Sequence, residues 1–383
     1  MRIDQFSSSI PGELIRISSD PEREQWAFLP NPLPPDWEPT IEMVNLIVES
    51  ERAIAALNML GQMLPNPHLL IRPFLQREAV ASSRIEGTVT NLKQLMLFDA
   101  DESASEDSAD AREVANYVRA IEYSLTQPPD RTISPALIKE LHALLMMDVR
   151  GSELHPGQYR KLQVYISGRG GRGARFVPPP PADVSALIDD LAQFIAAPSR
   201  LPELVRIALV HYQFETIHPF EDGNGRIGRL LMTMLLSRWG LLDKPLLYLS
   251  GYFERHRDEY IDGLSDVSRS GDWENWIALC LRAIAVQGND GVQRGRQLLE
   301  LREDYRIRFQ GGKRAGSLPV IDALFTWPTT TTRQVEERLE IPRFSAQRYI
   351  TTLVEEGILM ELTGRQRNRV FAAHEVIEIL SSP

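Results

Sequence analysis

The apolar residues of this chain recur mostly three and four positions apart, which is the spacing of a helix that packs into a protein core. This pattern predicts a helix from about Ile41 to Leu64 and further helices from Glu113 through Leu145. It also predicts two helices, Ile207 to Phe214 and Leu230 to Leu236, on either side of a polar loop. We therefore expect the main body of the protein to be α-helical.

A smaller unit is predicted near the C-terminus. Three short amphipathic helices are expected at Val320 to Phe325, Thr332 to Leu339 and Ser345 to Glu355. Two strands are expected at Leu359 to Leu362 and at Arg369 to Ala372. This arrangement resembles a winged helix-turn-helix.

The basic residues of this C-terminal unit suggest one function but leave a second interpretation open. In a winged helix-turn-helix, the third helix would carry Gln347 and Arg348 toward DNA, and Arg365, Arg367 and Arg369 would lie on the wing. Acidic residues dilute this charge, so the unit is equally well interpreted as a surface that packs on another chain or on the helical body.

Composition limits the classes of protein. The chain has 383 residues, enough for two or three domains, and 43% of them are hydrophobic. Its net charge of −10 disfavours nucleic-acid binding over the whole surface but allows a local basic patch. A single cysteine, Cys280, excludes an internal disulfide. Since the N-terminus predicts no signal peptide and no apolar run reaches the ~20 residues that span a bilayer, we expect a cytoplasmic protein without membrane contact.

The polar loop, residues 218–229, has the composition of a polyphosphate site. Gly223 and Gly225 permit a positive φ, so that successive N–H groups can turn toward an anion at the start of the second helix. Arg226 and Arg229 are three residues apart on that helix and hence on one face, where each offers a planar fork of donors to phosphate.

Two further side chains of the loop suit chemistry at that phosphate. Asp222 is an oxygen ligand of the kind that Mg²⁺ takes beside water and substrate phosphates. His218, with an ordinary pKa of ~6.5, is suited to take a proton from an attacking hydroxyl. Each residue alone has a common structural explanation, since Asp-Gly and Asn-Gly occur in ordinary turns. Together they predict phosphoryl or nucleotidyl transfer.

The spacing HxFx(D/E)GNGRxxR makes this chain resemble the Fic family of nucleotide-dependent protein-modifying transferases. The resemblance implies a Fic-type helical bundle with a β-hairpin flap, and ATP as the substrate. It implies that His218 deprotonates a Ser, Thr or Tyr hydroxyl of a target protein, that this hydroxyl attacks the α-phosphate, and that Asp222 binds Mg²⁺. The residues implied in binding the phosphates are Gly223, Asn224, Gly225, Arg226 and Arg229.

A second motif lies far upstream, at residues 82–87. Gly87 suits the positive-φ position that ends a helix, which places Glu86 at a helix C-terminus, where the macrodipole disfavours a carboxylate by up to about 1 kcal/mol. The segment alone predicts only a solvated glutamate. However, Ser82 and Glu86 match the pattern (S/T)xxxE(G/N), which resembles the inhibitory motif of Fic proteins. The resemblance implies that Glu86 pairs with Arg229, displaces the γ-phosphate and keeps basal activity low.

A hairpin is predicted between the two motifs, with strands at Leu162 to Ile166 and Ala174 to Val177. Its tip, residues 168–173, matches GxGxxG, but prolines follow where a dinucleotide-binding motif would start a helix. The resemblance implies that this hairpin is the flap that docks the target segment. The side chains that would suit an acidic target are Arg169, Arg172 and Arg175. A surface hairpin without function is the alternative.

These features predict four consecutive regions. They are an N-terminal helical region with the inhibitory motif (1–112), a Fic catalytic domain (113–288), a helical connector with a linker at Gly311 to Gly316 (289–318), and a winged helix-turn-helix (319–383). The acidic run from Asp99 to Asp110 predicts an exposed loop.

The function favoured by the sequence is a self-inhibited protein adenylyltransferase. One alternative is a DNA-binding transcriptional regulator whose Fic body senses ATP. Another is a Fic enzyme that uses a different nucleotide or removes AMP. Self-modification and a homodimer are further expectations.

Overall fold

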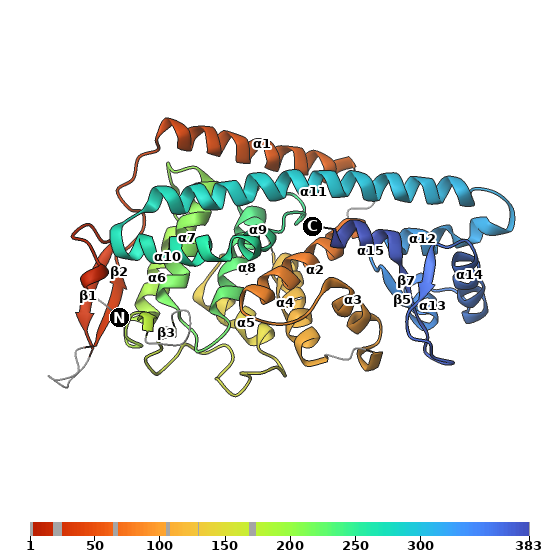
Figure 1. The fold of residues 1–383 in the computed structure, drawn as a ribbon, viewed down its shortest axis with the longest axis horizontal. Helices are drawn as coiled ribbons and strands as arrows, with labels where there is room; N and C mark the ends of the chain where they lie inside the picture. Colours follow the sequence, from red (N-terminus) through yellow and green to blue (C-terminus); the bar gives the residue numbers. More distant parts are fainter. Residues whose placement is uncertain are drawn as a thin grey trace. The chain divides into compact units, whose positions relative to one another are not determined.

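The computed structural model describes residues 3–17, 25–63, 68–104, 108–128, 130–167 and 174–382 (Figure 1). The chain divides into two compact units, and each unit draws on separate stretches of the sequence. Unit 1 comprises Met1–Ala53, Arg119–Leu241 and Tyr252–Val286, and unit 2 comprises Ile54–Val118, Leu242–Gly251 and Gln287–Pro383. Each unit therefore combines residues from more than one of the four predicted regions. The division of the sequence into four consecutive domains stays a prediction.

Unit 1 is built around helix α7 (Glu203–Ile217), which is buried along nearly its whole length. It packs against α6 (Val184–Ala196), α8 (Asn224–Arg238) and α10 (Arg257–Ser270), and α7 and α8 are drawn in green in Figure 1. Both helices predicted beside the polar loop are thus confirmed. They are longer than predicted because polar residues of the loop itself form the first turn of α8.

Helix α5 (Pro135–Leu145) completes the surroundings of the loop. It begins where the Ser134 side chain accepts a hydrogen bond of 3.3 Å from the Leu137 N–H, with Pro135 in the first turn. It packs against α6 and α8. The other helices predicted in this part of the chain are confirmed as α1 (Ile41–Met63) and α4 (Ser108–Thr126).

Two antiparallel hairpins belong to unit 1. Strands β1 (Gly12–Arg16) and β2 (Trp26–Pro30) pair from Gly12 opposite Pro30, and the sequence analysis did not predict them. Strands β3 (Ile166–Ser167) and β4 (Ala174–Phe176) confirm the hairpin predicted as the flap, although the first strand is shorter than expected. The predicted tip, with Arg169 and Arg172, lies outside the described residues.

Unit 2 contains helix α2 (His68–Ile85), helix α3 (Leu92–Ala100) and the C-terminal elements. The three predicted C-terminal helices are confirmed as α12 (Leu318–Leu324), α13 (Thr332–Leu339) and α14 (Arg343–Glu355). The two predicted strands are β6 (Leu359–Glu361) and β7 (Val370–Ala373), and β7 also pairs with an unpredicted strand, β5 (Thr329–Thr331), in a sheet of order β5-β7-β6. A final helix, α15 (His374–Ser381), follows. The assignment as a winged helix-turn-helix stays a prediction.

The C-terminal elements of unit 2 pack on α3, which begins with a capping box between Asn91 and Gln94. Its last carbonyl groups are satisfied from far along the chain. The Thr329 hydroxyl donates to the Met96 carbonyl at 2.5 Å, and the Gln334 amide donates to the carbonyls of Asp99 and Ala100, each at 3.2 Å. The bonds from Gln334 replace the intrahelical partners that the last carbonyl groups of a helix lack.

The glycine-rich stretch predicted as a linker has regular secondary structure. Helix α11 (Trp273–Phe309) runs unbroken through the predicted boundary between residues 288 and 289. The glycine-rich stretch after it forms a 3₁₀ helix, η4 (Gly312–Ser317), which packs against α14. Glycine content indicated a flexible connection, but packing against a neighbouring helix orders the backbone.

Candidate active site

The polar loop joins α7 to α8 as predicted. His218 is the C-terminal cap of α7 with a φ of 50°, and Gly223 is the N-terminal cap of α8 with a φ of 79°. The positive φ predicted at Gly223 is therefore confirmed. Gly225, which would also permit a positive φ, does not adopt one and lies in the first turn of α8. The left-handed backbone of His218 was not foreseen, and such a conformation is uncommon for a residue with a side chain.

The half-buried imidazole of His218 has a defined orientation. Its Nδ1 lies 3.3 Å from the carbonyl oxygen of Glu215. A carbonyl can only accept, so Nδ1 carries the proton in this contact and Nε2 is the nitrogen suited to take a further proton. This tautomer fits the role of a general base.

Arg160 fixes the backbone around His218. Its guanidinium is buried and donates to the carbonyl oxygens of His218 at 2.8 Å, Pro179 at 2.5 Å and Ile217 at 3.3 Å, and its own N–H donates to Pro219 at 2.9 Å. Burial lowers the pKa of Arg160 to about 10, so the guanidinium stays charged at neutral pH. One side chain thus joins the end of α7 to the chain that follows the hairpin.

Asp222 and Asn224 shape the turn before α8. The Asp222 carboxylate accepts a 2.6 Å hydrogen bond from the Gly223 N–H and is 43% exposed. The buried Asn224 side chain donates to the Phe220 carbonyl and accepts from the Phe220 N–H, both at 2.9 Å. The side-chain amide of Asn224 therefore holds the loop closed. The phosphate contact that the family resemblance implies for Asn224 would then come from its backbone N–H.

His142, on α5, is a residue of the site that sequence reasoning missed. Its Nδ1 accepts from the Gly157 N–H at 2.8 Å, so its Nε2 carries the proton that it donates to the Asp222 carbonyl at 3.0 Å. The ring stacks on Phe220 at 3.7 Å between centroids. Burial, with a contribution from the charge of Arg226, lowers the pKa of His142 to about 4, so the ring is neutral at pH 7.

The two arginines of the motif are almost completely buried, with 2% of Arg226 and 1% of Arg229 exposed. Nη2 of Arg226 lies 3.7 Å from the Asp222 carboxylate. Nη1 of Arg229 lies 3.4 Å from the Tyr260 hydroxyl, which in turn lies 2.8 Å from Nε2 of His211. Burial and the charge of Arg229 lower the pKa of His211 to about 3, so a neutral ring holds Tyr260 beside Arg229.

The donor set fits Mg²⁺ only together with a phosphate substrate. Asp222 offers one partly exposed carboxylate beside the N-terminus of α8. Over the described ranges, no cluster of three or more His, Cys, Asp or Glu side chains is placed to hold a metal ion. Because Mg²⁺ is usually held by one or two carboxylates plus substrate phosphates and water, Asp222 alone is sufficient.

The inhibitory motif lies at the end of α2 in unit 2. Ser82 is buried in the helix, Glu86 is the exposed cap residue, and Gly87 follows with a φ of 95°. The N–H of Thr88 donates to Ser83 at 3.1 Å and that of Gly87 to Arg84 at 3.0 Å, which is a Schellman motif. The predicted helix end is confirmed. The pairing of Glu86 with Arg229, a residue of unit 1, stays a prediction.

One arginine predicted to face a target is engaged elsewhere. The Arg175 guanidinium, on β4, pairs with the Asp262 carboxylate and donates to the Ser265 hydroxyl at 2.9 Å. Both partners lie on α10. Arg175 therefore anchors the second strand of the hairpin rather than presenting a charge to an acidic segment.

Comparisons with known proteins match this site. Residues 44–126 match the Fic/DOC family N-terminal model, and residues 132–236 match the Fic/DOC family model. The chain is a Fic family protein. The second match contains the whole loop from His218 to Arg229 and also His142 and Arg160.

The named relatives are protein adenylyltransferases. The chain is 28% identical over 202 residues to a probable protein adenylyltransferase of Aquifex aeolicus, covering 52% of this chain and 58% of the relative. It is 37% identical over 125 residues to the protein adenylyltransferase Fic of Drosophila melanogaster, covering 32% of this chain and 23% of the relative. The chain thus spans 58% of the length of the first relative and 23% of the length of the second.

Solved structures show the same fold. A Fic family protein from Desulfovibrio desulfuricans superposes with a TM-score of 0.58 at 21% identity, covering 89% of this chain and 98% of that one. Fic-1 of C. elegans superposes with a TM-score of 0.53 over 67% of this chain. Among the described residues, every helix is too short or too polar to span a bilayer.

Proposed function

We propose that this chain is a protein adenylyltransferase that moves AMP from ATP to a Ser, Thr or Tyr hydroxyl of a target protein. The observation that carries the proposal is the loop between α7 and α8. It combines a histidine whose Nδ1 faces a carbonyl, a partly exposed carboxylate and two buried arginines at a helix N-terminus. The relatives named as adenylyltransferases support it.

In the proposed reaction, the hydroxyl oxygen of the target attacks the α-phosphorus of ATP and Nε2 of His218 accepts the hydroxyl proton. The bond from the α-phosphorus to the bridging oxygen breaks, and pyrophosphate leaves with the electron pair. Arg226, Arg229 and the N–H groups that start α8 would bind the phosphate oxygens. Asp222 would hold Mg²⁺, which neutralises phosphate charge when bound. The protein then acts mainly by positioning and charge neutralisation.

Glu86 restrains this reaction in the proposed function by taking the place of the γ-phosphate at Arg229. Its position supports the proposal. Glu86 is the residue that ends α2, where the macrodipole of the helix disfavours a carboxylate and a cation would stabilise it. An arginine that binds either this carboxylate or a phosphate would make the two competitors.

Intact-mass analysis with magnesium ATP and a cell lysate tests both statements. Glu86→Gly is expected to add the mass of AMP to a lysate protein or to the chain itself, and Glu86→Gly with His218→Ala is expected to add none. Glu356→Gly is a matched control, because Glu356 caps α14 and precedes a positive-φ glycine in the same way. The inhibitory role is excluded if Glu86→Gly and Glu356→Gly give equal labelling. A different added mass, or loss of AMP from modified protein, would identify another Fic chemistry.

A further inference from the structure

A basic groove lies in unit 2, apart from the residues assigned to AMP transfer. It has a volume of about 500 Å³ and lies between the N-terminal turns of α13 and α14, the end of α3, and the wing, which we define as residues 363–369 between β6 and β7. The charged and amide side chains that the following argument uses are Asp101, Arg333, Arg343, Gln347, Arg367 and Arg369.

The described lining of this groove has four arginines and one aspartate, although the whole chain carries −10. Among the residues that the structure describes, Asp101 is the one acidic residue lining the groove, and the Arg365 guanidinium already pairs with its carboxylate at 2.9 Å. Arg333 pairs with Glu337 along the surface of α13 at 2.6 Å. Within the described part of the chain, Arg343 and Arg367 have no acidic partner, so their charges are available to an anion.

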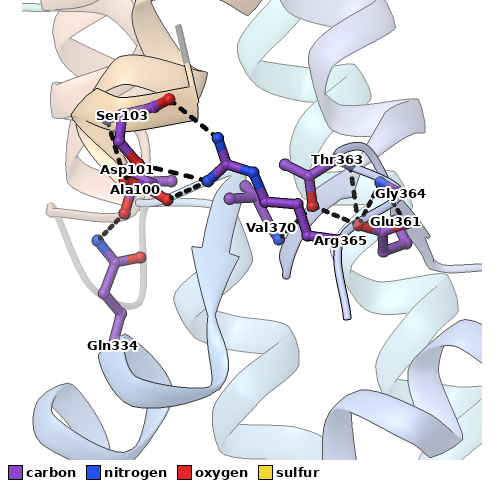
Figure 2. A network of polar contacts seen from close by, with 9 residues as sticks. All are labelled: Ala100, Asp101, Ser103, Gln334, Glu361, Thr363, Gly364, Arg365 and Val370. Atoms are coloured by element: carbon purple, nitrogen blue, oxygen red, sulfur yellow. Dashed lines mark hydrogen bonds and ion pairs between the residues drawn. The ribbon is translucent and has the colours of Figure 1, made fainter. Parts of the chain in front are cut away.

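The wing is held in place before any ligand binds, as Figure 2 shows. Arg365 donates to the Asp101 carboxylate and to the Ser103 carbonyl, each at 2.9 Å. The Glu361 carboxylate accepts from the Gly364 N–H at 3.0 Å and so fixes the turn that begins the wing. Asp101 was predicted to lie in an exposed acidic loop, but it anchors the wing instead. A fixed wing loses less conformational entropy on binding than a mobile one.

The exposed start of α14 carries side chains of the types that can contact DNA bases. Arg343 and Gln347 line the groove one turn apart, with Phe344 between them 79% exposed. Arginine and glutamine make the paired hydrogen bonds that distinguish guanine and adenine in the major groove. Arg348, predicted to face DNA, is not a lining residue and lies over the Tyr349 ring.

We propose that this groove binds double-stranded DNA, with the first turns of α14 in the major groove and the wing arginines on the phosphate backbone. The free positive charges come from separate elements, α14 and the wing, which suits a row of phosphates better than a single small anion. The interaction depends on the end of α3 as well as on the C-terminal elements, since Asp101 positions the wing.

Fluorescence anisotropy of the full chain with labelled duplexes of about 20 base pairs, two helical turns, tests this proposal. A random-sequence pool is used first and a selected sequence second. The wild type is expected to bind, and to lose affinity steeply between about 50 and about 200 mM salt. Arg343→Ala with Arg367→Ala is expected to weaken binding at least about tenfold and to lower the salt slope by about 2.

Lys93→Ala with Arg296→Ala removes two exposed basic residues of unit 2 that lie outside both the groove and α14, and it is the matched control. It is expected to bind duplex within about twofold of the wild type. Equal melting temperatures of both double variants and the wild type exclude unfolding as the cause. The proposal is overturned if the wild type binds no duplex at the lower salt concentration, or if the two double variants bind the duplex with equal affinity. It is also overturned if inorganic phosphate or an acidic peptide, added at the same total negative charge as the duplex, displaces the duplex completely.

Discussion

Replacing His142 by phenylalanine tests how far the loop geometry depends on one buried imidazole. Phenylalanine keeps a ring that can stack on Phe220, 3.7 Å away between centroids. It removes the acceptor of the Gly157 N–H, which lies at 2.8 Å, and the donor to the Asp222 carbonyl, which lies at 3.0 Å. The substitution therefore isolates the two hydrogen bonds from the packing of the ring.

Leaving a buried hydrogen-bonding group unsatisfied costs about 1–3 kcal/mol, so we expect the free energy of unfolding to fall by roughly 2–4 kcal/mol at pH 7. The pKa of His142 adds a pH dependence. Because burial lowers this pKa from 6.5 to about 4, the unfolded chain binds more protons between these values. The contribution of His142 to the free energy of unfolding of the wild type is therefore fully present above pH about 6.5. It falls by on the order of 3 kcal/mol as the pH is lowered to about 4. The variant lacks this loss.

Urea unfolding followed by tryptophan fluorescence at pH 7 and at pH about 5 measures both effects. The wild type should exceed His142→Phe in stability at pH 7, and the difference should shrink by roughly 2 kcal/mol at the lower pH. His211 titrates equally in both proteins and cancels. His374→Phe, at an exposed position in unit 2, should leave stability within about 0.5 kcal/mol of the wild type. Identical unfolding curves for His142→Phe and the wild type at both pH values would refute the reasoning.

Three further substitutions probe the same site. A methyl group at Gly228 would lie 2.3 Å from a carboxylate oxygen of Glu215, so Gly228→Ala should lower the free energy of unfolding by about 1–3 kcal/mol, and an unchanged urea midpoint would contradict this steric argument. Tyr260→Phe removes the hydroxyl 3.4 Å from Arg229, and titration calorimetry should show ATP binding about 3- to 10-fold weaker; equal affinity would exclude a positioning role. Asn224→Ala loses two buried hydrogen bonds of 2.9 Å, and hydrogen exchange of the loop amides should become faster, which an unchanged exchange rate would disprove.

The sequence predicted those features that depend on neighbouring residues. Periodicity placed the helices on both sides of the loop, and glycine chemistry identified Gly87 and Gly223 as left-handed positions. The same reasoning did not foresee the regular helical backbone at Gly225 and at η4. In both places glycine permits an unusual or flexible backbone but does not require one, and helical hydrogen bonding or packing decided the conformation.

The residues that orient the site could not be predicted in this way. His142 is 80 residues before the carbonyl group to which it donates, and Arg160 is 58 residues before the carbonyl of His218. His142 has no local pattern that separates it from an ordinary core residue. Their roles arise only when α5 and the segment before the hairpin are packed beside the loop, because a buried hydrogen bond depends on tertiary distance rather than on sequence spacing.

The hydrogen bond from Thr329 to Met96 has a consequence for how the protein is made. The two residues are 233 positions apart. At a synthesis rate of about 5–20 residues per second, roughly 10–50 s pass between their additions to the growing chain. During this interval the helix that follows Glu86 in the sequence has emerged without the groups that later cover its end. The nascent polypeptide can thus complete the α7–α8 loop well before the C-terminal elements that contact α3 have been synthesised.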